Sequence, residues 1–304
     1  SLAALGAALL LACLPFAAWA QKAAKAVPAF VMPYTGTLKK INDQGVIRLG
    51  YRENSPPFAF LADNGKPVGY SLDLCEVIVE ELAGELRKDI RVEMRPVTPE
   101  NRFDLIRSGE IDLECGSTVN NIGRRKVFGF SPTIFVTGAK NLVRRGSGIR
   151  SFADLGGKAV VLTRGTVHSE VIPKMAERQK LAITFISAAD HQESFQALVS
   201  GKADAFINDD VQLHGMLAET RSAADFRIVG DFLTYADYAL TMRKDDTDFA
   251  EVVDRAFTRL MGSREIVAIY EKWFLRPLPH GVRLNLRMSP HLEELFRVRG
   301  MPSD

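Results

Sequence analysis

Residues 113–124 read LECGSTVNNIGR and join an apolar strand pattern to a glycine and two hydroxyl side chains. The apolar run over 111–115 predicts a strand. Ser117 and Thr118 follow before an expected helix start, where free backbone N–H groups and hydroxyls point to one place. Arg124, about two helical turns later, adds a planar guanidinium that matches a carboxylate. The stretch predicts a site for an anion; the alternative is a helix N-cap beside an unrelated surface arginine.

The composition of the 304-residue chain is that of an ordinary soluble globular protein. Hydrophobic residues make up 46% and charged residues 25%, and the length allows two domains. The 39 basic and 37 acidic residues leave a net charge of +2. This balance gives no indication of a polyanionic partner such as nucleic acid.

The first twenty residues carry no charge, are rich in Ala and Leu, and end in a small-x-small pattern, Ala18-Trp-Ala20. The apolar run is short for a transmembrane helix and contains Pro15. We therefore predict a cleaved signal peptide over 1–20 and a flexible leader over 21–36. The alternatives are a short membrane anchor and a lipid-anchored protein modified at Cys13.

Three cysteines occur in the sequence. Cys13 would leave with the signal peptide, so Cys75 and Cys115 remain as an even pair in an oxidising compartment. A disulfide between them and two buried free thiols both fit this count.

Strand and helix patterns alternate along the chain, which predicts parallel sheets covered by helices. A turn at 63–66 predicts a hairpin, and Ser71 is a candidate N-cap of the following helix. The expected strands cover 46–51, 91–95, 111–115, 158–163, 183–187, 205–209 and 238–242. The expected helices include 37–43, 101–108, 249–260 and 265–274, and the compact fold is expected to end at about 276–280.

A short internal repeat relates the two halves of the chain. Residues 105–112 read LIRSGEID and residues 197–204 read ALVSGKAD. Each segment has the pattern of a helix end, a Ser-Gly cap and an aspartate that opens a strand. The repeat predicts two lobes of similar design.

Several polar residues follow expected strands or begin expected helices, where open α/β sheets place ligand groups. Arg52 ends the strand 46–51, although an exposed loop arginine would look the same in sequence. Arg102 lies in the first turn of a helix, where the helix dipole disfavours a cation, so an anion or a carboxylate such as Glu100 is expected nearby. The second half adds Thr163, Thr166, His191 and Asp209.

Together these motifs resemble the periplasmic solute-binding proteins of amino-acid ABC transporters, most of all those for glutamate and aspartate. The resemblance covers about 37–295 of the chain. It is carried by GYR at 50–52, VGYS at 68–71, NR at 101–102, ECGST at 114–118 with Arg124, FADL at 152–155, ADH at 189–191, DD at 209–210, RKDD at 243–246 and KWF at 272–274.

The resemblance implies the type II periplasmic binding protein fold: two lobes, each a mostly parallel sheet flanked by helices, joined by a two-segment hinge around the ligand. It places lobe 1 at 37–137 plus 233–276 and lobe 2 at 138–232, followed by a C-terminal tail at 277–304.

The resemblance also implies roles for individual residues. In the first lobe Arg124 would hold the α-carboxylate of an amino acid, helped by Ser117 and Thr118. In the second lobe Asp209 would accept the α-ammonium group.

The ligand's side-chain carboxylate would face Arg52, Arg102 and His191 by the same resemblance. Thr163 and Thr166 would donate hydrogen bonds from the second lobe. These three potential cations imply an acidic amino acid, and the choice between glutamate and aspartate stays open.

The expected function is capture of glutamate or aspartate in the periplasm by a monomer that delivers it to a membrane permease, without cofactor or metal. The sequence shows no nucleophile elbow, phosphate-binding glycine loop or metal-ligand spacing. The alternatives are an enzyme on the same fold, such as a cyclohexadienyl dehydratase-like lyase, and a sensor domain.

Overall fold

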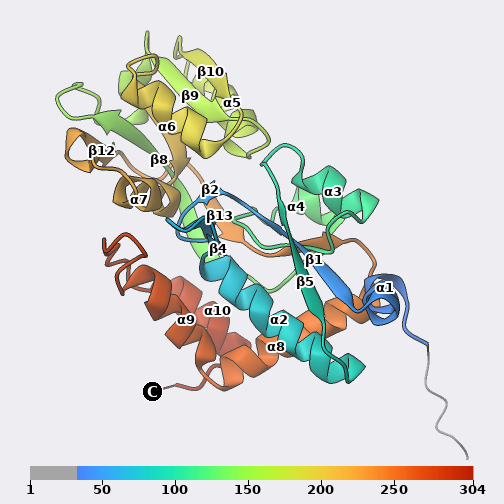
Figure 1. Ribbon diagram of the computed structural model, residues 1–304. Coiled ribbons are helices and arrows are strands. Elements are labelled where there is room, and N and C mark those ends of the chain that lie inside the picture. Colours follow the sequence, from blue (N-terminus) through green and yellow to red (C-terminus); the bar gives the residue numbers. More distant parts are fainter. Residues whose placement is uncertain (1–32, 304) are drawn as a thin grey trace, which may run out of the picture. The chain divides into compact units, whose positions relative to one another are not determined.

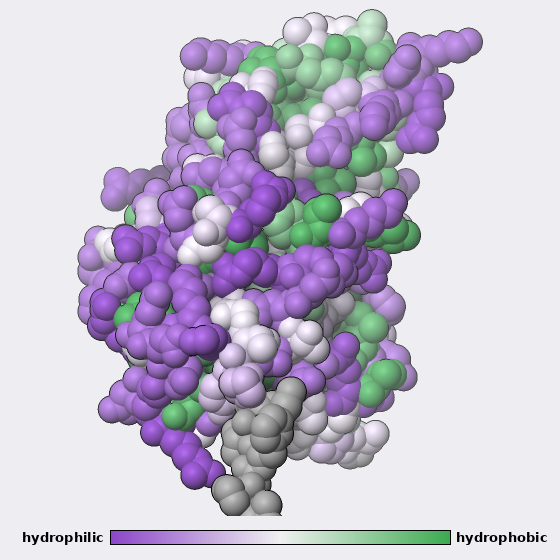
Figure 2. Space-filling view, turned by 90° about the vertical axis from the view of Figure 1, so that its right-hand side faces the viewer, coloured by the Kyte–Doolittle hydropathy of each residue, from purple (hydrophilic) through white to green (hydrophobic). Residues whose placement is uncertain are grey.

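The computed structural model describes residues 33–303. The expected signal peptide, 1–20, and the leader residues 21–32 lie outside this range. Within it the chain is mixed α/β, with two main sheets and a small third sheet. No helix among the described residues is long and apolar enough to cross a membrane. The face shown in Figure 2 is mainly hydrophilic, and its hydrophobic residues gather mostly in the upper part of the view.

The first lobe is built on a five-stranded sheet with the order β5-β1-β6-β14-β7 (Figure 1). β1 pairs in parallel with β5 and β6, whereas β14 is antiparallel to β6 and β7. The strands are β5 (Arg91–Pro96), β1 (Val46–Tyr51), β6 (Leu113–Glu114), β14 (Thr241–Arg243) and β7 (Phe128–Phe130). The helices are α1 (Gly36–Gln44), α2 (Tyr70–Leu86), α3 (Arg102–Ser108), α4 (Ile122–Arg125), α8 (Thr247–Gly262) and α9 (Glu265–Phe274).

A small sheet formed by β2 (Asn54–Ser55), β3 (Ala59–Leu61) and β4 (Pro67–Val68) belongs to the same lobe. β3 and β4 pair antiparallel around residues 62–66, so the hairpin predicted at 63–66 is confirmed. The apolar faces of α2, α8 and α9 and the first sheet form one large core.

The second lobe is built on a sheet with the order β10-β9-β11-β8-β12. Its strands are β10 (Thr184–Ala188), β9 (Ala159–Thr163), β11 (Ala205–Asp209), β8 (Phe135–Arg144) and β12 (Phe226–Val229). Its helices are α5 (His168–Arg178), α6 (His191–Val199) and α7 (Asp210–Ala218), with short 3-10 turns η1 (Phe152–Leu155) and η2 (Ala223–Asp225). Separate apolar clusters cover the two faces of the sheet.

Both main sheets are mixed, whereas strand–helix alternation predicted parallel sheets. The difference arises from the strands that connect the lobes. The first part of β8, over 135–138, pairs with β13 (Tyr235–Tyr238), and its second part, over 139–144, pairs with β11 and β12. The chain leaves the first lobe through β8 and returns to it through β13. The two segments therefore run in opposite directions and pair antiparallel.

The internal repeat has the same hydrogen bonds in both lobes. Asp112 accepts the backbone N–H of Arg48 at 3.0 Å, and Asp204 accepts that of Ala159 at 2.8 Å. Each aspartate N–H also donates to the carbonyl of the same strand residue, at 2.8 and 2.7 Å. In the first lobe the aspartate therefore holds the start of β6 next to β1. In the second lobe it holds the start of β11 next to β9.

The start of α2 differs from the sequence expectation. The helix begins at Tyr70, and Ser71 donates its hydroxyl hydrogen bond to the Gly116 carbonyl at 2.8 Å instead of capping the helix. Gly69 precedes it with φ of +144°, and a Cβ there would overlap the Phe58 carbonyl. Ser71 thus ties α2 to the stretch 113–124.

The segment expected to be a peripheral tail, 277–304, packs on the first lobe over its described part. It forms α10 (Pro290–Val298), capped by Ser289, whose side chain accepts the Leu292 N–H at 3.2 Å. Leu292, Phe296 and Met301 are buried in the large core of that lobe. The sequence pattern of α10 is amphipathic, so apolar burial explains the packing.

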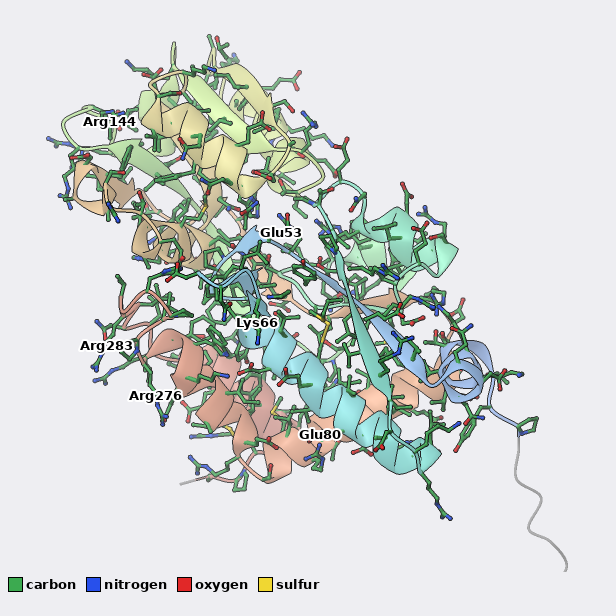
Figure 3. All side chains as sticks on the ribbon, in the orientation of Figure 1. Glu53, Lys66, Glu80, Arg144, Arg276 and Arg283 are labelled. Atoms are coloured by element: carbon green, nitrogen blue, oxygen red, sulfur yellow. A yellow bond between two sulfur atoms is a disulfide. The ribbon has the colours of Figure 1, made fainter. Side chains whose placement is uncertain are left out.

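A disulfide joins Cys75 in α2 to Cys115, which directly follows β6 (Figure 3). The two Cα atoms lie 6.3 Å apart and both side chains are fully buried. Together with the Ser71–Gly116 hydrogen bond, the bridge fixes the backbone just before Ser117.

We predict that the denatured, unreduced protein without its signal peptide contains no titratable thiol. Replacing both cysteines, Cys75→Ala with Cys115→Ala, should lower the free energy of unfolding by about 4 kcal/mol, because the bridge restricts a loop of 40 residues in the unfolded chain. Urea unfolding of the two proteins measures the difference. Two titratable thiols, or equal stabilities, would contradict this prediction.

Candidate functional site

A cavity lies between the carboxyl ends of β1 and β6 in the first lobe and the ends of β9 and β11 in the second. Its empty space amounts to about 310 Å³, including the part open to solvent. Seven of the nine predicted site residues line it: Arg52, Arg102, Ser117, Arg124, Thr166, His191 and Asp209. Sequence reasoning gave no role to the other lining residues, which are Val119, Val167, His168, Asn208 and Tyr238.

Two predicted residues do not line the cavity. Thr118 is buried, and its carbonyl accepts the backbone N–H of Ala239 at 3.0 Å. The Thr163 hydroxyl lies 3.0 Å from His191 Nδ1 and 2.7 Å from Ser194 Oγ. Thr163 therefore supports His191 from behind and is not placed to touch a ligand in the cavity.

The helix expected after Ser117 and Thr118 begins a few residues later than these hydroxyls. Residues 117–121 belong to no helix, and Val119 forms a β-bridge with Tyr238. The helix α4 starts at Ile122, spans four residues, and is capped by Asn121, whose side chain accepts the Arg124 N–H at 2.9 Å. Ser117 and Thr118 are therefore not the N-terminus of this helix.

Three guanidinium groups converge on the cavity from β1, α3 and α4. Arg52 and Arg102 are only 4% and 3% exposed, and Arg124 is half-buried. Arg102 Nη2 and Arg124 Nη2 both donate to the Gly165 carbonyl, at 3.1 and 3.4 Å. Among residues 33–303, no carboxylate lies within ion-pair distance of any of the three.

Burial, and next the neighbouring charge of Arg102, lower the pKa of Arg52 to about 9. The same two causes lower the pKa of Arg124 to about 10. Burial also lowers the pKa of Arg102. Unpaired buried charges are costly, so this cluster favours binding of a compact anion.

Phe103 helps to hold two of the cations. The Cζ atoms of Arg102 and Arg124 lie 4.6 and 4.9 Å from its ring centroid, which is cation–π distance. The ring in turn stacks on Phe128 at 4.7 Å. No sequence signal beyond its place next to Arg102 identified Phe103.

The opposite side of the cavity is negative. Asp209, at the end of β11, is 3% exposed and accepts a hydrogen bond from the Tyr238 hydroxyl through Oδ2. His168 Nε2 lies 3.3 Å from the same oxygen. Asp209 Oδ1 has no hydrogen-bond partner among the described residues. Burial raises the pKa of Tyr238, so the phenol stays a donor. A free carboxylate oxygen so placed is suited to an ammonium group.

His191 is not the third cation that the sequence suggested. It is the first residue of α6 and 3% exposed. Burial, and next the charge of Arg52, lower its pKa well below the usual value of 6.5. The imidazole is therefore neutral at pH 7 and can offer one hydrogen bond but no charge.

The loop after β9 touches the first lobe across the cavity. Gly165 has φ of +69°, and a Cβ on it would lie 2.5 Å from the Pro99 carbonyl oxygen. Beside it, Arg164 Nε lies 3.4 Å from a Glu100 carboxylate oxygen. Only a glycine permits this approach of the two backbones.

Comparison with known proteins gives one family and several relatives. The model of the bacterial extracellular solute-binding proteins, family 3, matches residues 47–276. The L-glutamate/L-aspartate-binding protein of Pseudomonas aeruginosa is 41% identical over 280 residues, 91% of this chain and 92% of that protein. The glutamate/aspartate import solute-binding protein of Escherichia coli is 40% identical over 263 residues, 86% and 87% of the two chains.

Among solved structures, an ancestral arginine-binding protein bound to arginine superposes with a TM-score of 0.69 at 28% identity, covering 76% of this chain and 98% of that one. The same kind of ancestral protein bound to glutamine gives 0.68 at 29% identity, with the same coverage. The expected type II periplasmic binding protein fold is confirmed by these similarities.

The depressed pKa of His191 predicts a pH dependence of stability. The unfolded chain takes up this proton near pH 6.5 and the folded chain does not, so stability is lost as the pH falls below 6.5. Between pH 7 and pH 5 the ligand-free protein should lose about 2 kcal/mol more than His191→Gln, measured by urea unfolding. Equal losses in the two proteins would contradict this.

Proposed function

The chain belongs to family 3 of the bacterial extracellular solute-binding proteins, and we propose that it captures glutamate or aspartate for an ABC transporter. The observation that supports this ligand is the set of three guanidinium groups, two buried and one half-buried, with no carboxylate within ion-pair distance among residues 33–303, opposite the free oxygen of Asp209. A small molecule with two carboxylates and one ammonium group could pair the carboxylates with the arginines and the ammonium group with Asp209. Three relatives that are 40–41% identical to this chain are named as binding proteins for these two amino acids.

In the proposed complex, Arg124 and Ser117 hold the α-carboxylate and Asp209 accepts the ammonium group. Arg52 and Arg102 bind the side-chain carboxylate, and neutral His191 donates a hydrogen bond to it. Thr166 lines the cavity from the second lobe, where its hydroxyl donates to the Thr163 carbonyl at 2.7 Å. Thr118 and Thr163 act indirectly, through the backbone and through His191.

The proposed lobes comprise 37–137 plus 233–276 and 138–232, hinged at β8 and β13. Ligand groups come from both lobes, so the ligand would shift the population towards the closed form. In this proposal a monomer works in the periplasm, after cleavage of residues 1–20, and delivers the ligand to a membrane permease.

The enzyme alternative is not favoured. The relatives that match at about 40% identity over most of the chain are named as solute-binding proteins of importers. A cyclohexadienyl dehydratase-like lyase would in addition convert a prephenate-like substrate, which a turnover assay would detect.

Calorimetry of ligand-stripped protein should give one site that strongly prefers glutamate or aspartate over glutamine. Arg102→Met should weaken glutamate by about ten- to a hundredfold, the cost of a lost charged hydrogen bond, and barely alter glutamine. Arg124→Met should weaken both ligands alike, since both carry the α-carboxylate. The assignment of Arg102 would be abandoned if Arg102→Met affected the two ligands equally.

A second prediction concerns closure. Gly165→Ala should reduce the affinity for every ligand at least tenfold, because the added methyl group would collide with Pro99 and raise the energy of the closed form. Small-angle scattering should show that ligand decreases the radius of gyration of the wild type but not of this variant.

Gly157→Ala is the matched control for this variant. Gly157 lies in the same lobe with φ of +74°, but nothing lies within 4 Å of its added Cβ. Gly157→Ala should therefore lower the free energy of unfolding by about as much as Gly165→Ala, on the order of 1 kcal/mol. It should leave the affinity for the ligand unchanged. If both variants lost affinity equally, backbone strain rather than closure would be responsible.

A further inference from the structure

Glu114 is a buried carboxylate that the proposed binding scheme does not use. It is 0% exposed in β6, between β1 and β14, in register with Gly50 and Thr241. Neither of its carboxylate oxygens has a hydrogen-bond partner among the described residues. A carboxylate that is fully buried without direct partners needs a compensating positive environment.

The positive environment is the guanidinium cluster. A Cβ placed on Gly116 would overlap Glu114 Oε1 and would lie 3.2 Å from Cγ of Arg52, so the carboxylate lies beside the stem of that arginine. Gly116 has no side chain, which leaves the room that both groups occupy. Arg52 lines the cavity and Glu114 does not. The Glu114 carboxylate therefore lies near the arginine cluster without forming an ion pair with any of its three guanidinium groups.

Among the carboxylates of residues 33–303, Glu114 is the one that acts on all three cations. Its charge raises the pKa of Arg52, of Arg102 and of Arg124 against the effect of burial. The partly buried Asp190 acts in this way on Arg52 alone, and the exposed Glu170 on Arg124 alone.

The charges of the arginines and the fully buried carboxylates at the site can be counted, with His191 neutral. Three guanidinium groups face the two buried carboxylates Glu114 and Asp209, which leaves one positive charge at the site. An acidic amino acid at neutral pH carries two carboxylates and one ammonium group, a net charge of −1. The site and this ligand class are therefore complementary in net charge as well as in position.

We propose that Glu114 determines the charge selectivity of the site, as a built-in anion that offsets one arginine without touching the ligand. This inference rests on the proposed function for the identity of the ligand. The charge of Glu114 reduces the electrostatic repulsion between the arginines in the ligand-free protein. It also weakens the attraction of the cluster for the side-chain carboxylate of the ligand.

The test is Glu114→Gln, which keeps the shape and removes the charge, studied at pH 8, where ordinary imidazoles are neutral. Two like charges a few ångströms apart in a protein interior change a binding constant by roughly tenfold or more. The variant should bind glutamate about tenfold more tightly than the wild type, with little change for glutamine. Its ligand-free melting temperature should fall, because the guanidinium groups then repel one another without compensation.

Asp104→Asn is the matched control, because Asp104 lies two residues after Arg102 on α3 but its side chain is 78% exposed. It removes the same charge from the protein and should change glutamate affinity less than twofold. The double variant Arg52→Gln with Glu114→Gln should recover the melting temperature, which a mere packing role of Glu114 would not predict. Unchanged or weaker glutamate binding by Glu114→Gln would overturn the proposal.

Glutarate separates this inference from the proposed function. It has two carboxylates and no ammonium group, so its stabilisation of Glu114→Gln should exceed that of the wild type whatever the natural ligand is. If the wild type bound no acidic amino acid, the proposed function would fail while the glutarate comparison still tested Glu114. Equal stabilisation of both proteins by glutarate would count against the role of Glu114 alone.

Discussion

Three guanidinium groups that converge on one small cavity, with no carboxylate within ion-pair distance among residues 33–303, are the constraint on which the site depends. Arg52 and Arg102 are almost fully removed from water, and the Gly165 carbonyl accepts hydrogen bonds from Arg102 and Arg124. Such a cluster is unfavourable in an isolated protein and becomes favourable when a compact dianionic group enters. Affinity and selectivity therefore have the same physical origin.

A disulfide and a side-chain hydrogen bond hold the backbone next to this cluster in place. The Cys75–Cys115 bridge and the Ser71 hydroxyl fix the backbone that leads to Ser117. The second lobe contributes Asp209 at the end of β11 and the loop at Gly165, and the paired segments β8 and β13 connect it to the first. In the proposed scheme the two halves of the site separate at these two segments.

Much of this arrangement was predictable from the sequence, because strand ends and helix starts are marked by local patterns. Arg52, Arg102 and Asp209 were identified in this way. The rest depends on tertiary contacts that no local pattern reports. Burial, not residue type, makes His191 neutral, and Phe103 matters only because two arginines converge on its ring.

A crystal structure of the protein with bound L-glutamate would test the proposed arrangement of the ligand. We predict the side-chain carboxylate within about 3 Å of guanidinium nitrogens of both Arg52 and Arg102, with the α-carboxylate on Arg124 and the ammonium group on Asp209 Oδ1. A ligand bound outside this cavity, or one whose side-chain carboxylate contacts neither Arg52 nor Arg102, would contradict this assignment.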